Sequence, residues 1–335
     1  MKNTSILIVG AGAVGLVLGY HFSLGAADVS FYIRENRILS FQSAQTLYCY
    51  DDSKLKSFSK FSTVSNLEEI SNAEYDFIIV TLDGIKCFSD EGCILLNQLA
   101  NSIRSKNTVI VIGGVGVGLR EHVLNITCLP KERVIQGMFA ILSHQVENAE
   151  LPVVAPTNYE NLNKASIAYR HVGGDVGFHI VSSLSSASHE FANAYNRCKI
   201  SRCILIGREL HEIITNSFFP FTAVCEIAGW PNIDVLTKNK PLWNLCCQAQ
   251  REIIGLPQHG RLGKFLSYVL RDGFLKLILK KLESNCLPLD FHAFNKFHHG
   301  FKVREQDIQV MRNCVLSGTS QGHSMVSLKL ILSYL

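Results

Sequence analysis

The sequence predicts an α/β protein, with a parallel-sheet domain followed by a mainly α-helical second domain. Short apolar runs that suit central parallel strands recur in the first part of the chain, at residues 6–9, 76–82 and 108–112. A glycine-rich turn directly follows the first of these runs. Beyond about residue 185 helical spacing dominates, and prolines separate the helical segments.

The first run, Ile6–Val9, leads into Gly10-Ala-Gly-Ala-Val-Gly15 and then a helical pattern to about Leu24. In such a turn the first glycine allows the tight bend, the second lets a pyrophosphate approach the backbone, and the third lets the helix pack against the strand. The N–H groups and dipole at the helix start attract phosphate. The turn therefore predicts a Rossmann-type dinucleotide site. Its expected contacts are Gly10, Ala11, Gly12, Ala13, Val14 and Gly15.

The second strand, Val29–Ile33, ends at Arg34, and Glu35, Asn36 and Arg37 follow. An acidic residue at this place usually binds the ribose of NAD, whereas an Arg suits the 2′-phosphate of NADP. A guanidinium can bind phosphate through two hydrogen bonds. Arg34 therefore favours NADP as the cofactor, and Glu35 keeps NAD as the less favoured alternative.

The remaining elements of the first domain follow in order. Residues 46–63 contain an acidic turn and predict a hairpin-like excursion. Residues 76–82 and 108–112 predict buried strands, and the second ends in a glycine-rich loop. Gly114 and Gly116 in that loop are expected to contact the cofactor through backbone N–H groups.

The length of 335 residues exceeds what one hydrophobic core usually serves, so we expect two domains. We place a dinucleotide-binding, Rossmann-like domain at residues 1–195 and a helical substrate and dimerisation domain at 196–335. Apolar residues make up 47% and charged residues 18%, which excludes a disordered chain.

Several classes of protein are excluded. A formal charge of +4 without a dense Lys/Arg run argues against nucleic acid as a partner. Glycines interrupt the apolar amino terminus, and Val109–Leu119 is too short to span a bilayer, so neither a signal peptide nor a membrane partner is expected. The 11 Cys form no CxxC pair, which predicts reduced thiols, a cytoplasmic protein and no metal site.

Five segments together resemble the ketopantoate reductase family. They are residues 6–15, 77–82, 111–116, 220–223 and 305–322, and they are spread over nearly the whole chain. The resemblance implies an oxidoreductase in which NADPH reduces the ketone of ketopantoate, a step of pantothenate biosynthesis. It also implies a small keto acid as partner and is compatible with a homodimer.

The chain departs from this family at the catalytic positions. The family's general-acid Lys falls on His211, its Asn on Gly113 and its Glu on Gln306. The substrate-binding Asn positions fall near Thr215 and Asn216. His211 could still donate a proton as an imidazolium, or it could be an ordinary core or surface His.

The segment 295–302 is a second source of catalytic groups. Lys302 could replace the missing Lys, His298 or His299 could polarise a carbonyl, and Asn295 could bind substrate. The histidines of this region lack the spacing of metal ligands, and an ordinary polar surface loop explains the segment equally well.

Three functions remain open. The first is an NADP-dependent reductase of a small 2-oxo acid or related ketone. The second is a nucleotide-binding protein that has lost catalysis and acts by binding or regulation. The third is an oxidoreductase for another hydroxy acid or sugar acid that uses Lys302 and the His pair.

Overall fold

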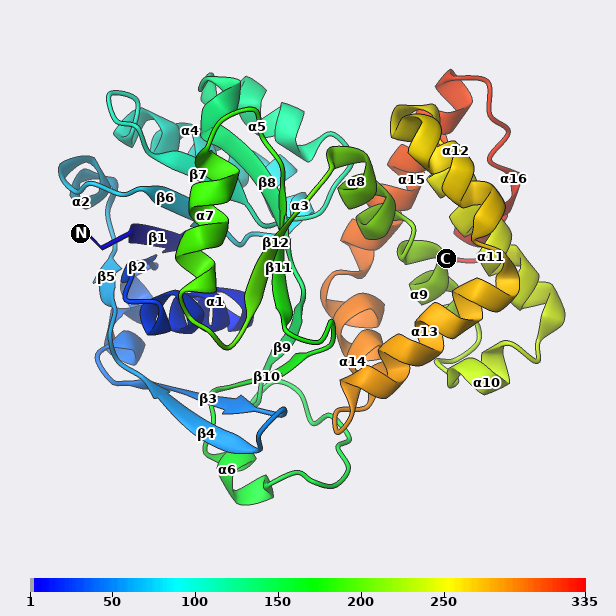
Figure 1. Cartoon of the computed structure of the whole chain (residues 1–335), viewed down its shortest axis with the longest axis horizontal. Helices are drawn as coiled ribbons and strands as arrows, with labels where there is room; N and C mark the ends of the chain where they lie inside the picture. Colours follow the sequence, from blue (N-terminus) through cyan, green and yellow to red (C-terminus); the bar gives the residue numbers. More distant parts are fainter. Residues whose placement is uncertain (1–2) are drawn as a thin grey trace. The chain divides into compact units, whose positions relative to one another are not determined.

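A computed structural model of the chain describes residues 3–335 and divides into two compact units (Figure 1). The first unit runs through Gly114 and adds Gly118–Glu150 and Ala155–Ile206. The second unit is Gly207–Leu335 with the short segments Val115–Val117 and Leu151–Val154. The first unit extends past the boundary expected at residues 195 and 196 because strand β12 (Arg202–Ile206) pairs with its sheet.

An eight-stranded sheet forms the centre of the first unit, in the order β12-β11-β8-β7-β6-β1-β2-β5. The six neighbouring strands β8, β7, β6, β1, β2 and β5 are all parallel, and β11 and β12 run antiparallel to them. This arrangement confirms the predicted α/β class. Their bounds are β1 Ser5–Val9, β2 Asp28–Tyr32, β5 Ser62–Val64, β6 Phe77–Val80, β7 Val109–Ile112, β8 Val134–Phe139 and β11 Val176–Val181.

Helices cover the sheet on both faces. Side chains alternate between the two faces along each strand, so successive residues enter opposite cores. Ile6 and Ile8 of β1 face the core that contains α1 (Ala13–Leu24) and α7 (Ala187–Asn196). Leu7 and Val9 face the opposite core. That second core includes residues of α2 (Leu67–Asn72), α4 (Asp90–Ser102) and α5 (Leu119–Thr127). Burial on both faces explains why the central strands are continuous apolar runs.

A smaller four-stranded sheet also belongs to the first unit, in the order β4-β3-β10-β9. Strands β3 (Gln45–Cys49) and β4 (Lys54–Phe58) form an antiparallel hairpin, which confirms the predicted excursion. Strand β10 (Ile167–His171) runs parallel to β3 and antiparallel to β9 (Ile141–Gln145). Helix α1 packs against β9 and β10, so the two sheets share one hydrophobic core.

Short elements join these strands. They are the 3₁₀ helices η1 Glu35–Phe41 and η2 Lys131–Arg133 and the helices α3 Gly84–Phe88 and α6 Tyr159–Asn163.

The second unit is helical, as the sequence predicts. Helix α11 (Lys240–Ile254) is its centre, and α9 (Phe219–Ile227), α12 (Gly260–Val269) and α16 (Val326–Leu332) pack against it. Its remaining elements are α8 Arg208–Asn216, α10 Ile233–Leu236, η3 Pro257–His259, α13 Asp272–Cys286, α14 Phe291–Phe297, the π-helical turn η4 His298–Lys302 and α15 Arg304–Ser320.

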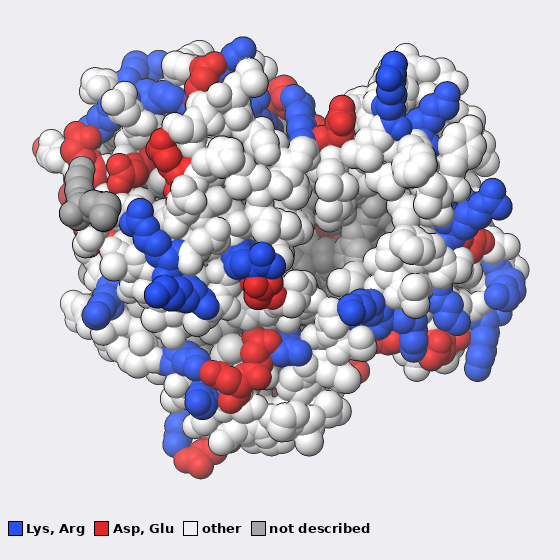
Figure 2. All heavy atoms as spheres, in the orientation of Figure 1, with Lys and Arg blue, Asp and Glu red and all other residues white. Residues whose placement is uncertain are grey.

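Two general properties concern the distribution of charge and the length of the helices. On the face that Figure 2 shows, Lys and Arg are interspersed with Asp and Glu and do not gather into one basic patch. Within residues 3–335, none of the helices combines the length and apolar character that a bilayer crossing requires.

Candidate functional site

The glycine turn lies where β1 ends, at a topological switch of the large sheet. The chain continues from β1 to β2 on one side and later places β6 on the other side. Ligands of open parallel sheets bind in the crevice outside the carboxyl ends of the strands at such a point. The turn between Val9 and Ala13 is therefore the first candidate for a ligand site.

Two of the three glycines are required by the fold itself. Gly10 has a φ of +106°, a conformation that disfavours other residues, and a Cβ there would collide with Thr81 Oγ1. The same hydroxyl donates hydrogen bonds to the carbonyl oxygens of Val9 and Gly10, at 3.0 Å each. A Cβ on Gly15 would collide with the carbonyl oxygen of Gly10. Packing therefore explains Gly10 and Gly15 without any ligand.

Gly12 is different. Its φ of −92° suits any residue, and a Cβ at this position would meet nothing within 4 Å. Gly12 is the N-cap of α1, it makes no side-chain cap, and the first turn of the helix contains no acidic residue. The open space in front of the first helical N–H groups is what a phosphate of a dinucleotide needs. The residues of the turn therefore fit such a cofactor.

Two arginines follow β2, beside the turn. Arg34 is exposed and is the N-cap of η1. Arg37 donates from Nη1 to the carbonyl oxygen of Ala11 at 3.3 Å, and its guanidinium lies 5.3 Å from the ring centre of Phe41. The sequence analysis chose Arg34 alone. Arg37 lies three residues after Arg34, one helical turn further along the chain, and this spacing is the signal that could have identified it.

The glycine-rich loop after β7 has a structural explanation at one of its two predicted positions. Gly114 is buried, and a Cβ there would lie 2.7 Å from the carbonyl oxygen of Leu82. Packing alone thus accounts for Gly114. Gly116 is half-buried and lies in the Val115–Val117 segment of the second unit.

In the second unit His299 and Asp307 form a largely buried pair of titratable groups. The Nδ1 of His299 lies 2.7 Å from Oδ2 of Asp307. The side chain of Asp307 is 5% exposed and that of His299 is 16% exposed. The imidazole packs against the rings of Phe218 and Phe219. A π-helical turn, a feature common at functional sites, carries the His into this position.

Burial and neighbouring charges shift the titration of this cluster. Burial raises the pKa of Asp307, and the hydrogen bond from His299 opposes that rise. Burial, followed by the positive charges of His299 and Lys302, holds the pKa of His298 well below its usual range. His298 therefore stays neutral near neutral pH and can act as a hydrogen-bonding group but not as an acid.

The structure brings some of the predicted catalytic residues together. His298 stacks on Phe294, and its ring centre lies 4.8 Å from that of His299. Lys302, at the end of the same π-helical turn, is exposed. Gln306 is buried on α15 beside Asp307. Residues 295–302, for which a polar surface loop was one of two interpretations, are helical.

The other predicted residues lie on α8 and α14. His211 is 1% exposed, and Thr215 and Asn216 are buried as well. Thr215 donates its hydroxyl to the carbonyl oxygen of His211 at 2.9 Å, a bond within its own helix. Asn295 is buried and donates in the same way to Phe291, at 2.7 Å. These local bonds occupy one donor in each side chain.

Asp307 was not selected from the sequence, because the family's Glu position on the late helix falls on Gln306. Counting along the sequence does not show which side of a helix is buried. The neighbouring carboxylates Glu305 and Asp307 differ strongly in this respect, since Glu305 is exposed and Asp307 is buried. The tertiary structure therefore selects between them.

A family model described as Ketopantoate reductase PanE/ApbA matches residues 6–161. The resemblance predicted from the sequence is thus confirmed, and the family consists of oxidoreductases acting on CH–OH and C=O groups. No curated protein is significantly similar to the chain in sequence.

Solved structures are similar over the full length of the chain. The 2-dehydropantoate 2-reductase of Geobacter metallireducens has a TM-score of 0.70 at 17% identity and covers 99% of this chain and 98% of its own. The enzyme of the same name from Methylococcus capsulatus has a TM-score of 0.67 at 15% identity, covering 98% and 94%. A D-mandelate dehydrogenase with NADH and anilino(oxo)acetate has a TM-score of 0.65 at 10% identity, and the match covers 99% of this chain and 96% of that protein. The structural similarity shows the fold, and the low identities fit a divergent sequence.

Proposed function

The amino-terminal part of this chain belongs to the ketopantoate reductase family, and from that premise we propose that the protein is an NADP-dependent reductase of a small 2-oxo acid or related ketone. The observation that carries the proposal is the contrast among the three glycines of the turn. Gly10 and Gly15 are required by packing, whereas Gly12 has open space around it and needs to be small only if a ligand approaches.

The cofactor is held by groups of the first unit. The N–H groups at the start of α1, with Gly12 at the cap, bind the pyrophosphate. Arg34 and Arg37 bind the 2′-phosphate, which favours NADP over NAD. Ala11, Ala13, Val14 and Gly116 remain proposed contacts. When bound, NADPH supplies the hydride for reduction of the ketone.

The proton is handled by groups of the second unit. Nδ1 of His299 is occupied by its contact with Asp307, so Nε2 is the atom that gives a proton to the alkoxide oxygen of the product. The carboxylate of Asp307 stabilises the imidazolium before transfer and fixes the orientation of the ring. Lys302 is the second candidate for the acid, His298 and Gln306 orient the substrate, and His211, Thr215, Asn216 and Asn295 remain proposed contributors.

A cofactor titration followed by a substrate screen tests this function. Purified protein is titrated with NADPH and NADH by nucleotide fluorescence, and NADPH oxidation is then followed with a panel of 2-oxo acids that includes ketopantoate. We expect NADPH to bind more tightly than NADH and at least one 2-oxo acid to support turnover. Absence of nucleotide binding would overturn the proposal.

A nucleotide-binding protein without turnover is the second candidate. The burial of His211 favours it, because this residue occupies the position of the family's general acid and is almost inaccessible. NADPH binding without oxidation by any 2-oxo acid or hydroxy acid would support this alternative over the reductase.

We also propose a homodimer. A ketopantoate reductase of Staphylococcus aureus with the same fold is described as dimeric, with a TM-score of 0.62 to this chain. Light scattering coupled to gel filtration measures the mass directly, and a mass of one chain at micromolar concentration would contradict the dimer.

A further inference from the structure

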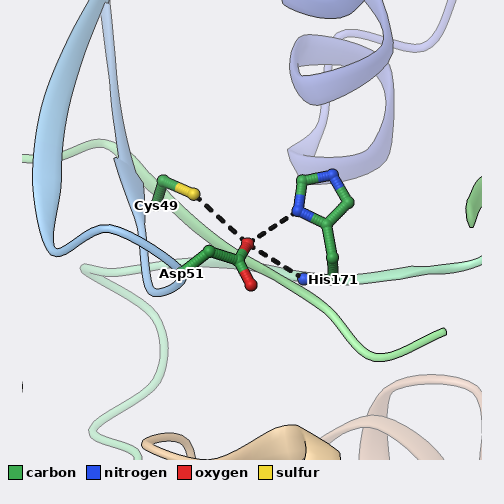
Figure 3. A group of neighbouring side chains, drawn as sticks. All are labelled: Cys49, Asp51 and His171. Carbon is green, nitrogen blue, oxygen red and sulfur yellow. Dashed lines mark hydrogen bonds and ion pairs between the residues drawn. The ribbon is translucent and has the colours of Figure 1, made fainter. Parts of the chain in front are cut away.

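Three side chains of different chemistry meet at one end of the smaller sheet. Cys49 ends β3, Asp51 lies in the turn that follows, and His171 ends β10. Figure 3 shows the thiol and the imidazole both directed toward the Asp51 carboxylate. One ligand atom from each of the three lies within 4.8 Å of the others. Among residues 3–335 this is the one group of His, Cys and acidic side chains with that property.

The sheet register explains why the three meet. In the parallel pair of β3 and β10, Cys49 lies opposite Tyr169. Asp51 follows two residues after Cys49, in the turn beyond β3, and its carboxylate accepts hydrogen bonds from the Cys49 thiol and from the backbone N–H of His171. Asp51 and His171 are 120 positions apart in sequence, and for this reason no local spacing signals the cluster.

The existing contacts already resemble a coordination shell. Oδ2 of Asp51 lies 2.6 Å from Nδ1 of His171 and accepts a hydrogen bond from the Cys49 thiol at 3.3 Å. The other oxygen, Oδ1, accepts from Arg170. The Arg thus orients the carboxylate from outside, as hydrogen-bond partners of ligating carboxylates do. The positive charge of Arg170 also repels a metal cation, and the attraction of the thiolate and the carboxylate must exceed this repulsion.

The second nitrogen of His171 supports a role beyond an ordinary ion pair. The side chain of His171 is only 9% exposed, and its Nε2 has no hydrogen-bond partner among the described residues. Its ring stacks on that of His21, whose pKa burial lowers to about 3. Because His21 stays neutral at physiological pH, it adds no positive charge beside the cluster.

A cavity of about 360 Å³ opens beside the three side chains. It is lined by Cys49, Asp51 and His171 together with Tyr20, Asp52, Lys56, Tyr169, Gly174, Asp175 and Ile200. The cavity gives an ion a route of entry and leaves a coordination position for water.

We propose that Cys49, Asp51 and His171 form a binding site for a zinc-class divalent metal ion, separate from the nucleotide turn. Thiolate, imidazole and carboxylate are the ligands that Zn²⁺ and its borderline neighbours prefer. Typical zinc–ligand distances of about 2.0–2.3 Å place neighbouring ligands roughly 3.3–3.8 Å apart. The sulfur and the carboxylate oxygen already meet this spacing, and the nitrogen and oxygen need to separate by under about 1 Å.

Binding must release a proton from the cluster. Burial and the charge of Asp51 raise the pKa of the Cys49 thiol to about 12, so the thiol is protonated near neutral pH. The metal–sulfur bond replaces the S–H bond, and that proton passes to solvent. One ion therefore displaces the thiol proton of Cys49.

Metal titration of the whole chain tests the site. Protein freed of metal with a chelator is titrated with Zn²⁺ by calorimetry in two buffers of different ionisation enthalpy, and with Co²⁺ by absorption. We expect one ion and about one released proton per chain near neutral pH. We also expect a thiolate-to-cobalt charge-transfer band in the near ultraviolet.

Matched variants separate this site from the other cysteines and histidines. Cys49→Ser should remove the charge-transfer band, and both Cys49→Ser and His171→Gln should weaken Zn²⁺ binding by at least about tenfold, since even outer partners of a metal site contribute that much. Cys203→Ser changes a buried residue and His179→Gln a half-buried residue of the large sheet, and both should leave binding unchanged. Far-ultraviolet circular dichroism checks that each variant is folded.

The proposal is overturned if the parent protein takes up no Zn²⁺ at micromolar concentration. It is equally overturned if Cys49→Ser binds like Cys203→Ser, in which case the three residues are an ion-pair network only. Should Cys49→Ser fail to fold, the comparison of His171→Gln with His179→Gln decides in its place.

Discussion

Arg37 donates a hydrogen bond from Nη1 to the carbonyl oxygen of Ala11 at 3.3 Å, across 26 positions of sequence. The parallel register of β1 and β2, which pairs Val9 with Tyr32, brings these two residues together. The bond places a guanidinium beside the glycine turn, on the side where the adenosine ribose of a dinucleotide lies in proteins of this fold.

Gly12→Asp should separate stability from nucleotide binding. The position has open space and extended backbone angles, and Asp is a favourable N-cap, so the melting temperature should stay equal or rise. The new carboxylate would occupy the phosphate position and repel it. NADPH binding, measured by fluorescence, should weaken by at least about tenfold.

Gly15→Ala is the contrasting variant. Its Cβ collides with the backbone at Gly10, so we expect a loss of about 1–3 kcal/mol in the free energy of unfolding. Urea unfolding of both variants measures the difference. Equal stability of Gly15→Ala and the parent, or unchanged NADPH binding by Gly12→Asp, contradicts the assignment of the turn.

The two arginines after β2 should set the preference between nicotinamide cofactors. Arg34→Ala and Arg37→Ala should each weaken NADPH binding by about 10–100-fold, the value of a charge-assisted hydrogen bond, and should affect NADH much less. Dissociation constants for both nucleotides provide the test. Arg133→Ala, distant in sequence and bonded to Thr108, is a control for the loss of an arginine. Equal losses for NADPH and NADH would mean that the arginines are structural.

Turnover should depend on the pair of His299 and Asp307. We expect His299→Gln and Asp307→Asn to lower kcat by about 10²–10⁴-fold while NADPH still binds, because each removes part of the proton-donating unit. Unchanged kcat in both variants would exclude the pair.

Lys302→Met and His211→Gln test the alternative acids that the sequence suggested. Since Lys302 is exposed and His211 is buried, we expect smaller effects on kcat than for His299→Gln. A larger loss of kcat in Lys302→Met than in His299→Gln would show that Lys302 is the acid.

Stability should fall as the solution becomes acidic. Burial lowers the pKa of His21 to about 3 and also holds the pKa of His298 well below 6.5. Below pH 6.5 the unfolded chain therefore binds protons at these residues that the folded chain does not. The free energy of unfolding decreases from pH 6.5 down to each folded pKa, by up to about 1.4 kcal/mol per pH unit and residue.

Urea unfolding at about pH 7 and about pH 5 measures this slope, which should flatten in His21→Gln relative to the parent. The exposed His323 offers the matched control, because His323→Gln should leave the slope unchanged. An identical slope in His21→Gln and the parent would contradict the burial argument for His21.

Part of the candidate site could be predicted from sequence because its signals are local. Gly10, Gly12 and Gly15 lie within six positions and carry their own conformational requirements. Arg34 was found in the same way, by its place after an apolar strand. Arg37 and Asp307 were not selected, since the hydrogen bond to Ala11 and the burial against the π-helical turn depend on segments that meet only in the folded chain.

The sequence by itself determined the order of elements. Continuous apolar runs such as Ile6–Val9 are typical of strands that are buried on both faces of a parallel sheet, and they therefore predict the α/β class. The tertiary structure alone decided which polar groups meet. Cys49, Asp51 and His171 come together because the register of β3 and β10 aligns strand ends that are far apart in sequence. Register depends on packing across whole sheets, and no short window of sequence contains that information.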